Sequence, residues 1–521
     1  MDTNFYQNWH VRKPVATGAN GVVASHHKAA AEVGAAVLRD GGNAIDAAIA
    51  TSFAVSVVEP WMSGLGGLGY MMVYLAKEKR VLCINGGAIS PGGLDVANYP
   101  MTNGESGDLF TWPAVKDDRN VQGYHSIATP GYVATVGLAH DKYATKSWAE
   151  LLAPAAEMAE RGLPANWATT LYIAGAAPDI ANYPETKSIY MPNGFPPVAI
   201  GGKPVPHLPM GNLARTLKRL AMAGHRDFYE GEIAAQIIAD MKAGGGSLSA
   251  ADLAKYQAQE LASLAIPHGD AVVHAAPGLT AGPTMADAMS KFAGKITGDK
   301  EPNANDYRLW ATAMRDAFET RFDTMGDVDD SRDPASTTHL TVIDGEGNIV
   351  SFTQTLLSAF GSKVVLPETG ILMNNGIMWF DPRPDLPNSL GPNKRPLSNM
   401  CPVIVTADGE PWFAAGGSGG RKIMSAVMQL TSMVVDCGMD LDSAFHQPRI
   451  DYSGGGSTAI DTRLGDDVEA AIAAHMPTRR EEQTILPNNF AKPNGVMKDP
   501  DTGEFQGAAD VSNPVSGVIA G

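Results

Sequence analysis

The chain has 521 residues, 44% of them hydrophobic and 18% charged, and its formal net charge is −17. Length and composition predict one large globular domain or two closely packed ones and exclude a disordered chain. The net charge argues against non-specific nucleic-acid binding, because such a chain does not neutralise phosphates.

The three cysteines, Cys83, Cys401 and Cys437, lie in no CxxC or Cys/His spacing. This argues against a disulfide framework, and neither a metal nor a cofactor is expected. The amino-terminal stretch MDTNFYQNWHVRKPVATG lacks the apolar core of a signal peptide. No uninterrupted apolar stretch reaches membrane-spanning length. The sequence therefore predicts a soluble, cytoplasmic protein without membrane contact.

Helices dominate the first half of the chain. An alanine-rich helix ends at Gly41-Gly42, where glycines suit a helix C-cap. A second, apolar helix runs from Ala44 to about Val58. Further helices are expected over 131–143 and after Ser147, which opens a capping box.

The run Gly64-Leu65-Gly66-Gly67-Leu68-Gly69 matches the dinucleotide-binding fingerprint GxGxxG letter for letter. An apolar helix precedes it and a strand follows, whereas phosphate binding needs a strand before the glycines and a helix after them. The run is therefore interpreted as a structural turn, and a nucleotide-dependent oxidoreductase is disfavoured.

The second half changes to strands. A helix over 306–322 precedes the acidic segment 323–336, which has no periodicity and is typical of a linker. One long helix follows the predicted strands, which lie at 338–343, 349–355, 402–406 and 411–415. This order of elements favours layered helices and sheets.

The first two of these strands form a hairpin around DGEGN (344–348). If Asp344 pairs with Asn348, Thr337 lies opposite Thr355, with Cβ atoms roughly 4.5–5.5 Å apart. Two adjacent hydroxyls that directly follow a flexible acidic segment are suited to act as a nucleophile and its hydrogen-bonding partner. The alternative is two β-favouring threonines in an ordinary strand pair, and a one-residue slip would separate them.

The turn Gly416-Gly417-Ser418-Gly419-Gly420 lies between a predicted strand and the long helix. Such a turn can aim backbone N–H groups at an anion, assisted by the helix dipole, as an oxyanion hole does. A nucleotide-phosphate loop is disfavoured, because no Lys-Ser/Thr pair follows. A sharp connector that needs glycine dihedral angles is the alternative.

Several motifs together closely resemble the γ-glutamyltransferase family of N-terminal-nucleophile hydrolases. They are LRDGGNAIDAAIA (38–50), SGLGG (63–67), TPG (129–131), Thr337-Thr338-His339, Thr355, GPNKRPLSNMCP (391–402) and GGSGG (416–420). The resemblance covers nearly the whole chain. It implies an α+β fold, a four-layer αββα sandwich. It also implies a precursor cut between Ser336 and Thr337 into a helix-rich large subunit, 1–336, and a catalytic small subunit, 337–521, which remain associated as one compact unit.

By position, the resemblance makes Thr337 the nucleophile and Thr355 the residue that supports its hydroxyl and α-amine. It makes the N–H groups of Gly419 and Gly420 the oxyanion hole, and the pair Ser398-Asn399 the substrate contact. The chemistry is consistent, because a threonine hydroxyl is a poor nucleophile without a base. Cleavage before Thr337 frees an α-amine whose pKa is about 7.7–8, near working pH.

Four positions depart from the γ-glutamyl-specific members. Their arginine for the substrate α-carboxylate aligns with Gly87, and three polar residues for the α-amino end align with Leu357, Gly376 and Trp379. Each lost hydrogen bond to a charged group is worth roughly 1.5–3 kcal/mol, so selectivity should fall by orders of magnitude. Asp381 is a candidate substitute, and the segment 381–390 is shorter than the family's lid loop.

These departures predict an amidohydrolase or acylase-like branch: a self-cleaving threonine enzyme that hydrolyses, or transfers, the acyl group of a small amide through acyl-Thr337. Leu357 and Trp379 favour a less polar acyl group. The alternative is an ordinary γ-glutamyltransferase, or glutathione hydrolase, with a rearranged substrate shell. A non-catalytic binding protein on the same scaffold would remain one uncut chain. The expected partners are a small-molecule amide and the companion subunit, and a homodimer is left open.

Overall fold

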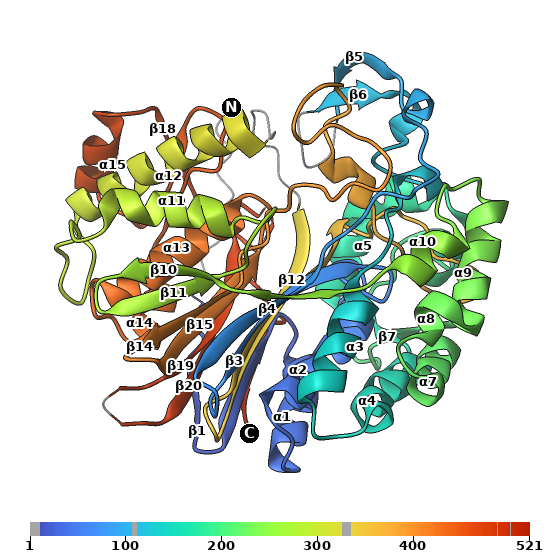
Figure 1. Cartoon of the computed structure of the whole chain (residues 1–521), viewed down its shortest axis with the longest axis horizontal. Coiled ribbons are helices and arrows are strands. Elements are labelled where there is room, and N and C mark those ends of the chain that lie inside the picture. Colours follow the sequence, from blue (N-terminus) through green and yellow to red (C-terminus); the bar gives the residue numbers. More distant parts are fainter. Residues whose placement is uncertain (1–10, 107–111, 326–334, 487, 501) are drawn as a thin grey trace.

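Two seven-stranded sheets lie face to face, and helices cover the outer face of each (Figure 1). The computed structural model describes residues 11–106, 112–325, 335–486, 488–500 and 502–521. Neighbouring strands in both large sheets are antiparallel. Each sheet buries one face against the other sheet and one against helices. This confirms the α+β, four-layer αββα sandwich that the resemblance implies.

Both large sheets take strands from the two halves of the chain. The order of the first sheet is β21 (Gly517–Ala520), β2 (Gly21–Ser25), β12 (Ala335–Asp344), β13 (Ile349–Ser358), β3 (Leu68–Leu75), β4 (Arg80–Gly86) and β9 (Gln259–Ala262). The order of the second is β1 (Ala16–Gly18), β20 (Phe505–Ala509), β19 (Lys492–Lys498), β15 (Glu410–Ser418), β14 (Val403–Ala407), β11 (Ala271–Ala275) and β10 (Leu264–His268). The segments before and after residue 336 are therefore interleaved.

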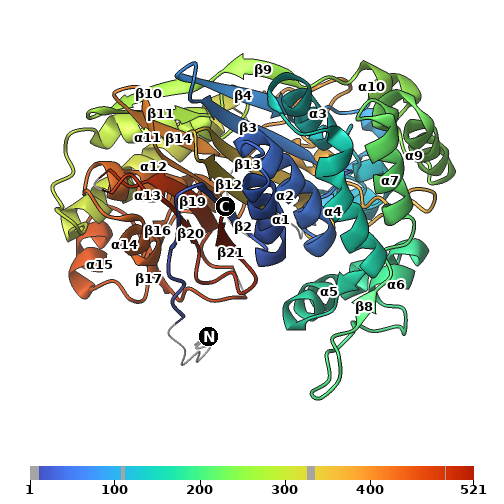
Figure 2. The ribbon, with the colours of Figure 1, turned by 90° about the horizontal axis from the view of Figure 1, so that it is seen from below.

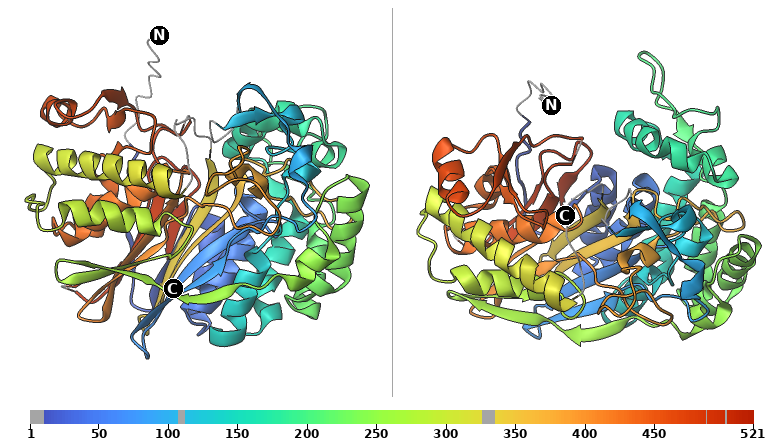
Figure 3. Two further views of the ribbon diagram at one scale, coloured as in Figure 1. Left: turned by 45° about the horizontal axis from the view of Figure 1, so that its top comes forward. Right: turned by 90° about the horizontal axis from the view of Figure 1, so that it is seen from above.

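The helices form the two outer layers, which Figure 3 shows from two further sides. Over the first sheet lie α1 (Lys28–Arg39), α2 (Ala44–Val58) and α3 (Tyr132–Tyr143), and beyond them α4 (Trp148–Arg161), α7 (Leu213–Ala223), α8 (Asp227–Glu230), α9 (Glu232–Ala243) and α10 (Ala250–Lys255). Over the second sheet lie α11 (Gly282–Phe292), α12 (Ala304–Met325), α13 (Lys422–Val435), α14 (Leu441–His446) and α15 (Asp466–Ala473).

Smaller elements lie at the margins of this frame. An extension carries α5 (Trp167–Ile180), α6 (Pro184–Tyr190) and the paired strands β7 (Leu163–Pro164) and β8 (His207–Leu208) (Figure 2). Two further small sheets are formed by β5 (Met101–Glu105) with β6 (Pro113–Val115), and by β16 (Ile450–Asp451), β17 (Thr458–Asp461) and β18 (Thr478–Glu481).

Helix α2 is buried along its whole length, because it lies between the first sheet and α4. Apolar residues on every side are expected for a helix with protein all around it. Asn43 caps its N-terminus, and Asp46 completes a capping box. The predicted bounds, Ala44 to about Val58, are confirmed.

The sheets approach closely where His339 of β12 lies against Gly416 of β15. A Cβ at Gly416 would come within 2.3 Å of the His339 ring. Two further contacts cross the same space: Ser351 Oγ donates to the Ala415 carbonyl at 3.1 Å, and Thr341 Oγ1 donates to Asn494 Oδ1 at 2.6 Å. The interior is therefore partly polar beside the ends of β12 and β13.

Most predicted elements are confirmed with small shifts. The helices over 131–143 and 306–322 correspond to α3 and α12, and Ser147 caps α4 with the expected capping box. The strands at 338–343 and 349–355 lie inside β12 and β13, 402–406 is shifted by one residue in β14, and 411–415 lies inside β15. The linker predicted over 323–336 lies, from 326 to 334, outside the described residues.

Candidate active site

The hairpin of β12 and β13 brings Thr337 and Thr355 together. Strand pairing of 338–343 with 349–354 has the register predicted from the DGEGN turn. At Thr337 itself a β-bulge interrupts the ladder, which the sequence did not predict. The hydroxyls still meet: Thr337 Oγ1 donates to Thr355 Oγ1 at 3.4 Å, and both side chains are buried. The bulge therefore lies at the bond where the resemblance implies cleavage.

The Thr355 hydroxyl is held in place by the backbone that follows it. Its Oγ1 accepts a hydrogen bond of 2.8 Å from the N–H of Leu357. Leu357 has a φ of 85°, in the left-handed region that residues with a side chain rarely adopt. Residues held in such conformations cluster at active sites, where the surroundings impose the geometry. A strained turn thus orients the Thr355 oxygen next to Thr337.

The glycine turn lies where β15 ends and α13 begins. Gly419 and Gly420 have φ values of 133° and 55°. A Cβ at Gly419 would come within 2.8 Å of Ala491 Cα, so only glycine fits there. In the described part of the chain, the N–H groups of these two half-buried glycines donate to no other group. The turn therefore presents two backbone donors at a helix N-terminus, the arrangement that an anion-binding turn requires.

A buried carboxyl and a buried amine connect the threonines to the glycine turn. Thr338 Oγ1 donates to Glu59 Oε2 at 2.8 Å, and Glu59 caps the C-terminal end of α2. Burial raises the pKa of Glu59 to about 7, although the Thr338 hydrogen bond and the charge of Lys492 lower it. Burial also lowers the pKa of Lys492 to about 8. Lys492 of β19 pairs with Ser418 at the end of β15, so this amine lies next to the glycine turn.

Arg321 of α12 holds the Ser398-Asn399 pair. Its Nη2 donates to the Ser398 carbonyl and to Asn399 Oδ1, both at 2.9 Å, and its side chain is buried. The sequence interpretation missed this residue. A signal exists, because Arg321 follows Ala317 and Phe318 at helical spacing and therefore lies on the buried face of its helix. Glu59 was missed as well, although it directly follows the buried and mainly apolar helix α2.

The four departing positions offer no charged side chain. A Cβ at Gly87 would lie 2.3 Å from the Tyr70 hydroxyl oxygen, and one at Gly376 would lie 2.8 Å from the Cβ of a neighbouring alanine. Neither position therefore has room for a longer side chain. Leu357 and Trp379 are buried in the apolar cluster between the sheets.

Asp381, the candidate substitute, is already paired. Its side chain is fully buried, and the guanidinium of Arg383 donates to Oδ1 through Nε at 2.9 Å and to Oδ2 through Nη2 at 2.5 Å. The backbone N–H of Arg383 also donates to Oδ1. This carboxylate is therefore neutralised within its own loop, and the geometry does not support the substitution considered from the sequence.

Residues 64–67 of the glycine run form a turn between α2 and β3, as predicted, and Leu68 and Gly69 begin β3. A Cβ at Gly67 would come within 2.5 Å of the Thr355 carbonyl oxygen, and one at Gly66 within 2.4 Å of the Leu372 carbonyl oxygen. These glycines let the chain pass close to the threonine pair. The strand that follows provides no helix N-terminus for a phosphate, which agrees with the interpretation as a structural turn.

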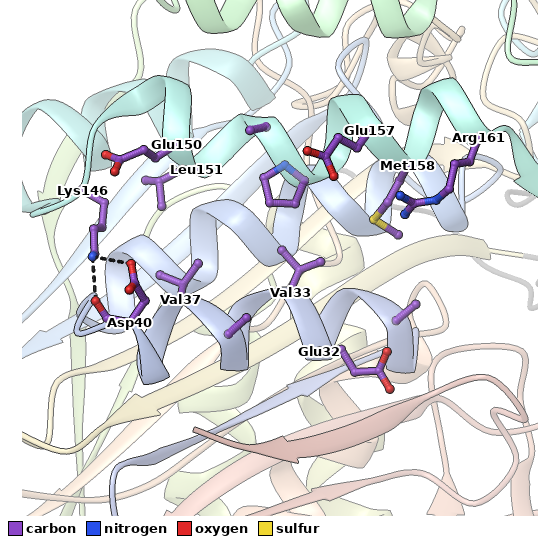
Figure 4. A pocket seen from close by; sticks show the side chains of 14 residues that line it. Glu32, Val33, Val37, Asp40, Lys146, Glu150, Leu151, Glu157, Met158 and Arg161 are labelled. Atoms are coloured by element: carbon purple, nitrogen blue, oxygen red, sulfur yellow. Dashed lines mark hydrogen bonds and ion pairs between the residues drawn. The ribbon is translucent and has the colours of Figure 1, made fainter.

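A separate surface groove of about 650 Å³ lies between α1 and α4 (Figure 4). Its floor includes Val33, Val37 and Leu151, and Lys146 donates to Asp40 Oδ2 at 2.7 Å at one end. No serine, threonine, cysteine or histidine lines it. The groove therefore holds no hydroxyl, thiol or imidazole nucleophile.

Two findings concern other classes of site. Across the described ranges, no group of histidine, cysteine, aspartate and glutamate side chains is arranged to hold a metal ion. No helix among the described residues is long and apolar enough to cross a membrane.

Known proteins share this architecture. The family profile described as Gamma-glutamyltranspeptidase matches residues 30–334 and 330–518. The glutathione hydrolase proenzyme of Bacillus subtilis (strain 168) is 28% identical over 96% of this chain and 91% of its own length. The acylase ACY 1 proenzyme of Pseudomonas sp. (strain V22) is 29% identical over 96% and 93%. The crystal structure of cephalosporin acylase from Bacillus halodurans has a TM-score of 0.84 at 24% identity, covering 100% of this chain and 99% of that one, which shows the fold.

Proposed function

The chain belongs to the γ-glutamyltranspeptidase family, and we propose that it is a self-cleaving threonine amidohydrolase or acyltransferase of the acylase-like branch. It acts on a small amide through an acyl-Thr337 intermediate. The observation that carries this proposal is the 3.4 Å contact between the Thr337 and Thr355 hydroxyls at the bulge that begins β12. The names of two relatives, both proenzymes, support a precursor that is processed.

Maturation begins with attack of Thr337 Oγ1 on the carbonyl carbon of Ser336. The peptide C–N bond breaks as the acyl group moves to oxygen, which leaves an ester and a free α-amine on Thr337. Water hydrolyses the ester, and Ser336 becomes a new carboxyl terminus. The products are a large subunit, 1–336, and a small subunit, 337–521, which stay associated because they share both sheets.

Turnover uses the amine that maturation creates. The α-amine of Thr337 accepts the hydroxyl proton while Oγ1 attacks the substrate carbonyl, and it returns a proton to the departing amine. The N–H groups of Gly419 and Gly420 stabilise the negative charge on the tetrahedral oxygen. Water then releases the acid, or an acceptor amine takes the acyl group. Ser398-Asn399, held by Arg321, contacts the acyl group.

A denaturing mass measurement tests the maturation step. Wild type should yield fragments 1–336 and 337–521, and Thr337→Ala only the full-length chain. Thr341→Ala, a buried threonine of the same strand, is the matched control and should still be cut. Amino-terminal sequencing of active enzyme that finds no new start at residue 337 would falsify the proposal.

The substrate class needs a separate assay. Glutaryl and short-chain acyl anilides should be cleaved in preference to a γ-glutamyl anilide, because the four departing positions lack the polar groups of γ-glutamyl-specific members. A strong preference for the γ-glutamyl compound would instead support an ordinary γ-glutamyltransferase with a rearranged substrate shell. A full-length chain that turns over none of these amides would point to a binding protein.

A further inference from the structure

The extension that carries α5, α6, β7 and β8, residues 163–210, concentrates exposed apolar side chains. Of the eleven large hydrophobic side chains that the described part of the chain exposes, six lie in this extension. These six form what we call the apolar arm surface: Trp167, Leu171, Phe195, Val198, Ile200 and Val205. Single exposed apolar residues are ordinary on a folded protein, whereas a concentration of them marks an interaction surface.

The helix and the loop of the extension contribute to one surface. Trp167, Thr170 and Leu171 have the spacing i, i+3, i+4 and therefore share one face of α5. Thr170 Oγ1 donates to the Pro197 carbonyl at 2.5 Å, which holds the loop 192–207 against this face. Figure 2 shows the extension projecting away from the two sheets. The exposed side chains of α5 and of the loop are therefore neighbours on a protrusion.

Aromatic contacts fix the extension to the body of the protein. Tyr172 of α5 stacks on Trp61 with ring centroids 5.0 Å apart, and Tyr190 of α6 meets Phe360 edge-on, also at 5.0 Å. Five of the sixteen residues 192–207 are prolines, which restrict the backbone of the loop. A surface that is already ordered loses little conformational entropy when a partner covers it.

The extension is electrically neutral, unlike the rest of the chain. It carries two acids, Asp179 and Glu185, and two bases, Lys187 and Lys203. These four charges cancel, so the other residues carry the whole formal net charge of −17. Two copies of such a chain repel each other, and the repulsion is smallest where the surfaces in contact are neutral. The arm surface is therefore a place where a second copy can approach.

Other kinds of partner fit this surface less well. Residues 192–207 contain one lysine and no arginine, aspartate or glutamate. A segment that lies on a membrane combines apolar side chains with several cations that face anionic headgroups. A strongly charged protein partner would need charges of the opposite sign. Homodimer interfaces, in contrast, are more apolar than other interfaces, and a twofold axis pairs the same patch with itself.

The size of the surface suits a stable dimer. All residues from 192 to 207 are exposed except Pro196 and Pro197, which are half-buried. With the exposed face of α5, each copy presents about 20 residues, close to the ~20–30 residues a side of a standard protein interface. Trp167 and Phe195 supply aromatic side chains of the kind that contribute most to binding energy.

We propose that the apolar arm surface is the interface of a homodimer, in which the extensions of two copies pack against each other around a twofold axis. The surface lies outside the threonine pair and the glycine turn. The inference therefore goes beyond the proposed function and does not depend on it.

Sedimentation equilibrium of the full chain tests the inference. Wild type should have twice the mass of one chain, with a Kd of about 1 μM or lower. Phe195→Asp/Ile200→Asp replaces side chains that are 62% and 60% exposed and should raise Kd at least about 100-fold, because the dimer would bury unpaired carboxylates. Phe195→Leu/Ile200→Val should retain the dimer. Met222→Asp, at an 80% exposed position of α7 outside the extension, is the matched control and should leave Kd unchanged.

Each measurement is repeated in the Thr337→Ala background, so that the result does not depend on cleavage. A monomeric wild type overturns the inference. A dimer that the double aspartate variant leaves intact, or that Met222→Asp weakens equally, overturns it as well. Flotation of a monomeric wild type with phosphatidylcholine vesicles would assign the surface to a membrane instead.

Discussion

Replacing Glu59 by glutamine should change how the protein's stability depends on pH. Glu59 is 1% exposed, and its carboxylate accepts a hydrogen bond from Thr338, the residue next to Thr337. Burial holds its pKa at about 7, well above the ordinary value of 4.5. Glutamine keeps the shape and an oxygen acceptor but does not titrate, so the substitution isolates the ionisation.

The sign and size follow from the two protonation states. Between pH 4.5 and about 7, native Glu59 keeps its proton while the unfolded chain has released it. Stability from Glu59 is therefore full below pH 4.5 and is lost as pH rises to about 7. At about 1.4 kcal/mol per pH unit, the whole interval corresponds to about 3 kcal/mol. The glutamine variant should gain that amount relative to its parent over the interval.

Thermal unfolding of Thr337→Ala and of Thr337→Ala/Glu59→Gln measures the difference in uncut chains. With an unfolding entropy of about 2.1 cal/mol/K per residue, about 3 kcal/mol corresponds to about 3 °C in relative Tm. Burial lowers the pKa of His26 to about 4, but this histidine is present in both proteins, and Lys492, with a pKa of about 8, titrates above the interval. Glu157→Gln, at an exposed glutamate, should show no trend. A Tm difference that stays constant from pH 4.5 to 7 would refute the reasoning.

Three further substitutions probe the packing and the site. Gly416→Ala should destabilise the fold by about 1–3 kcal/mol in urea titrations, because the new Cβ would meet His339, and the loss should shrink when His339 is also alanine. Thr355→Val should lower kcat by roughly 10- to 100-fold while circular dichroism stays native, and an unchanged kcat would contradict the hydroxyl pairing. Arg321→Lys should raise KM more than it lowers kcat, because lysine lacks the fork that holds Ser398 and Asn399; an unchanged KM would remove its positioning role.

Local patterns allowed much of the fold to be predicted from the sequence. The DGEGN turn and the alternation around it determine the hairpin register, which the structure reproduces over 338–343 and 349–354. The apolar run before Glu59 and the capping residue Asn43 determine α2. These features depend on residues that are neighbours in the sequence, so local residue patterns are sufficient to predict them.

Features that depend on distant contacts were not predicted. The bulge at Thr337 arises where the pairing of β12 with β13 changes register. The neighbouring residues contain no sequence signal that predicts it. Arg321 reaches Asn399 across 78 positions of sequence, and Glu59 reaches Thr338 across 279. The pairing of Asp381 with Arg383 is local, but the sequence does not reveal that the Asp381 carboxylate is paired with this guanidinium and therefore not free to bind a substrate.

The interleaving of the sheets has a consequence for how the protein is made. Strand β12 inserts between β2, from the early part of the chain, and β13, which follows it, and β13 in turn pairs with β3. A continuous polypeptide can form this interleaved strand order in a unimolecular folding reaction. If the chain is cut before Thr337, denaturation releases two separate subunits. Their reassociation is bimolecular and therefore depends on protein concentration. The stability of the cut protein would then be kinetic: it would depend on slow unfolding rather than on efficient refolding.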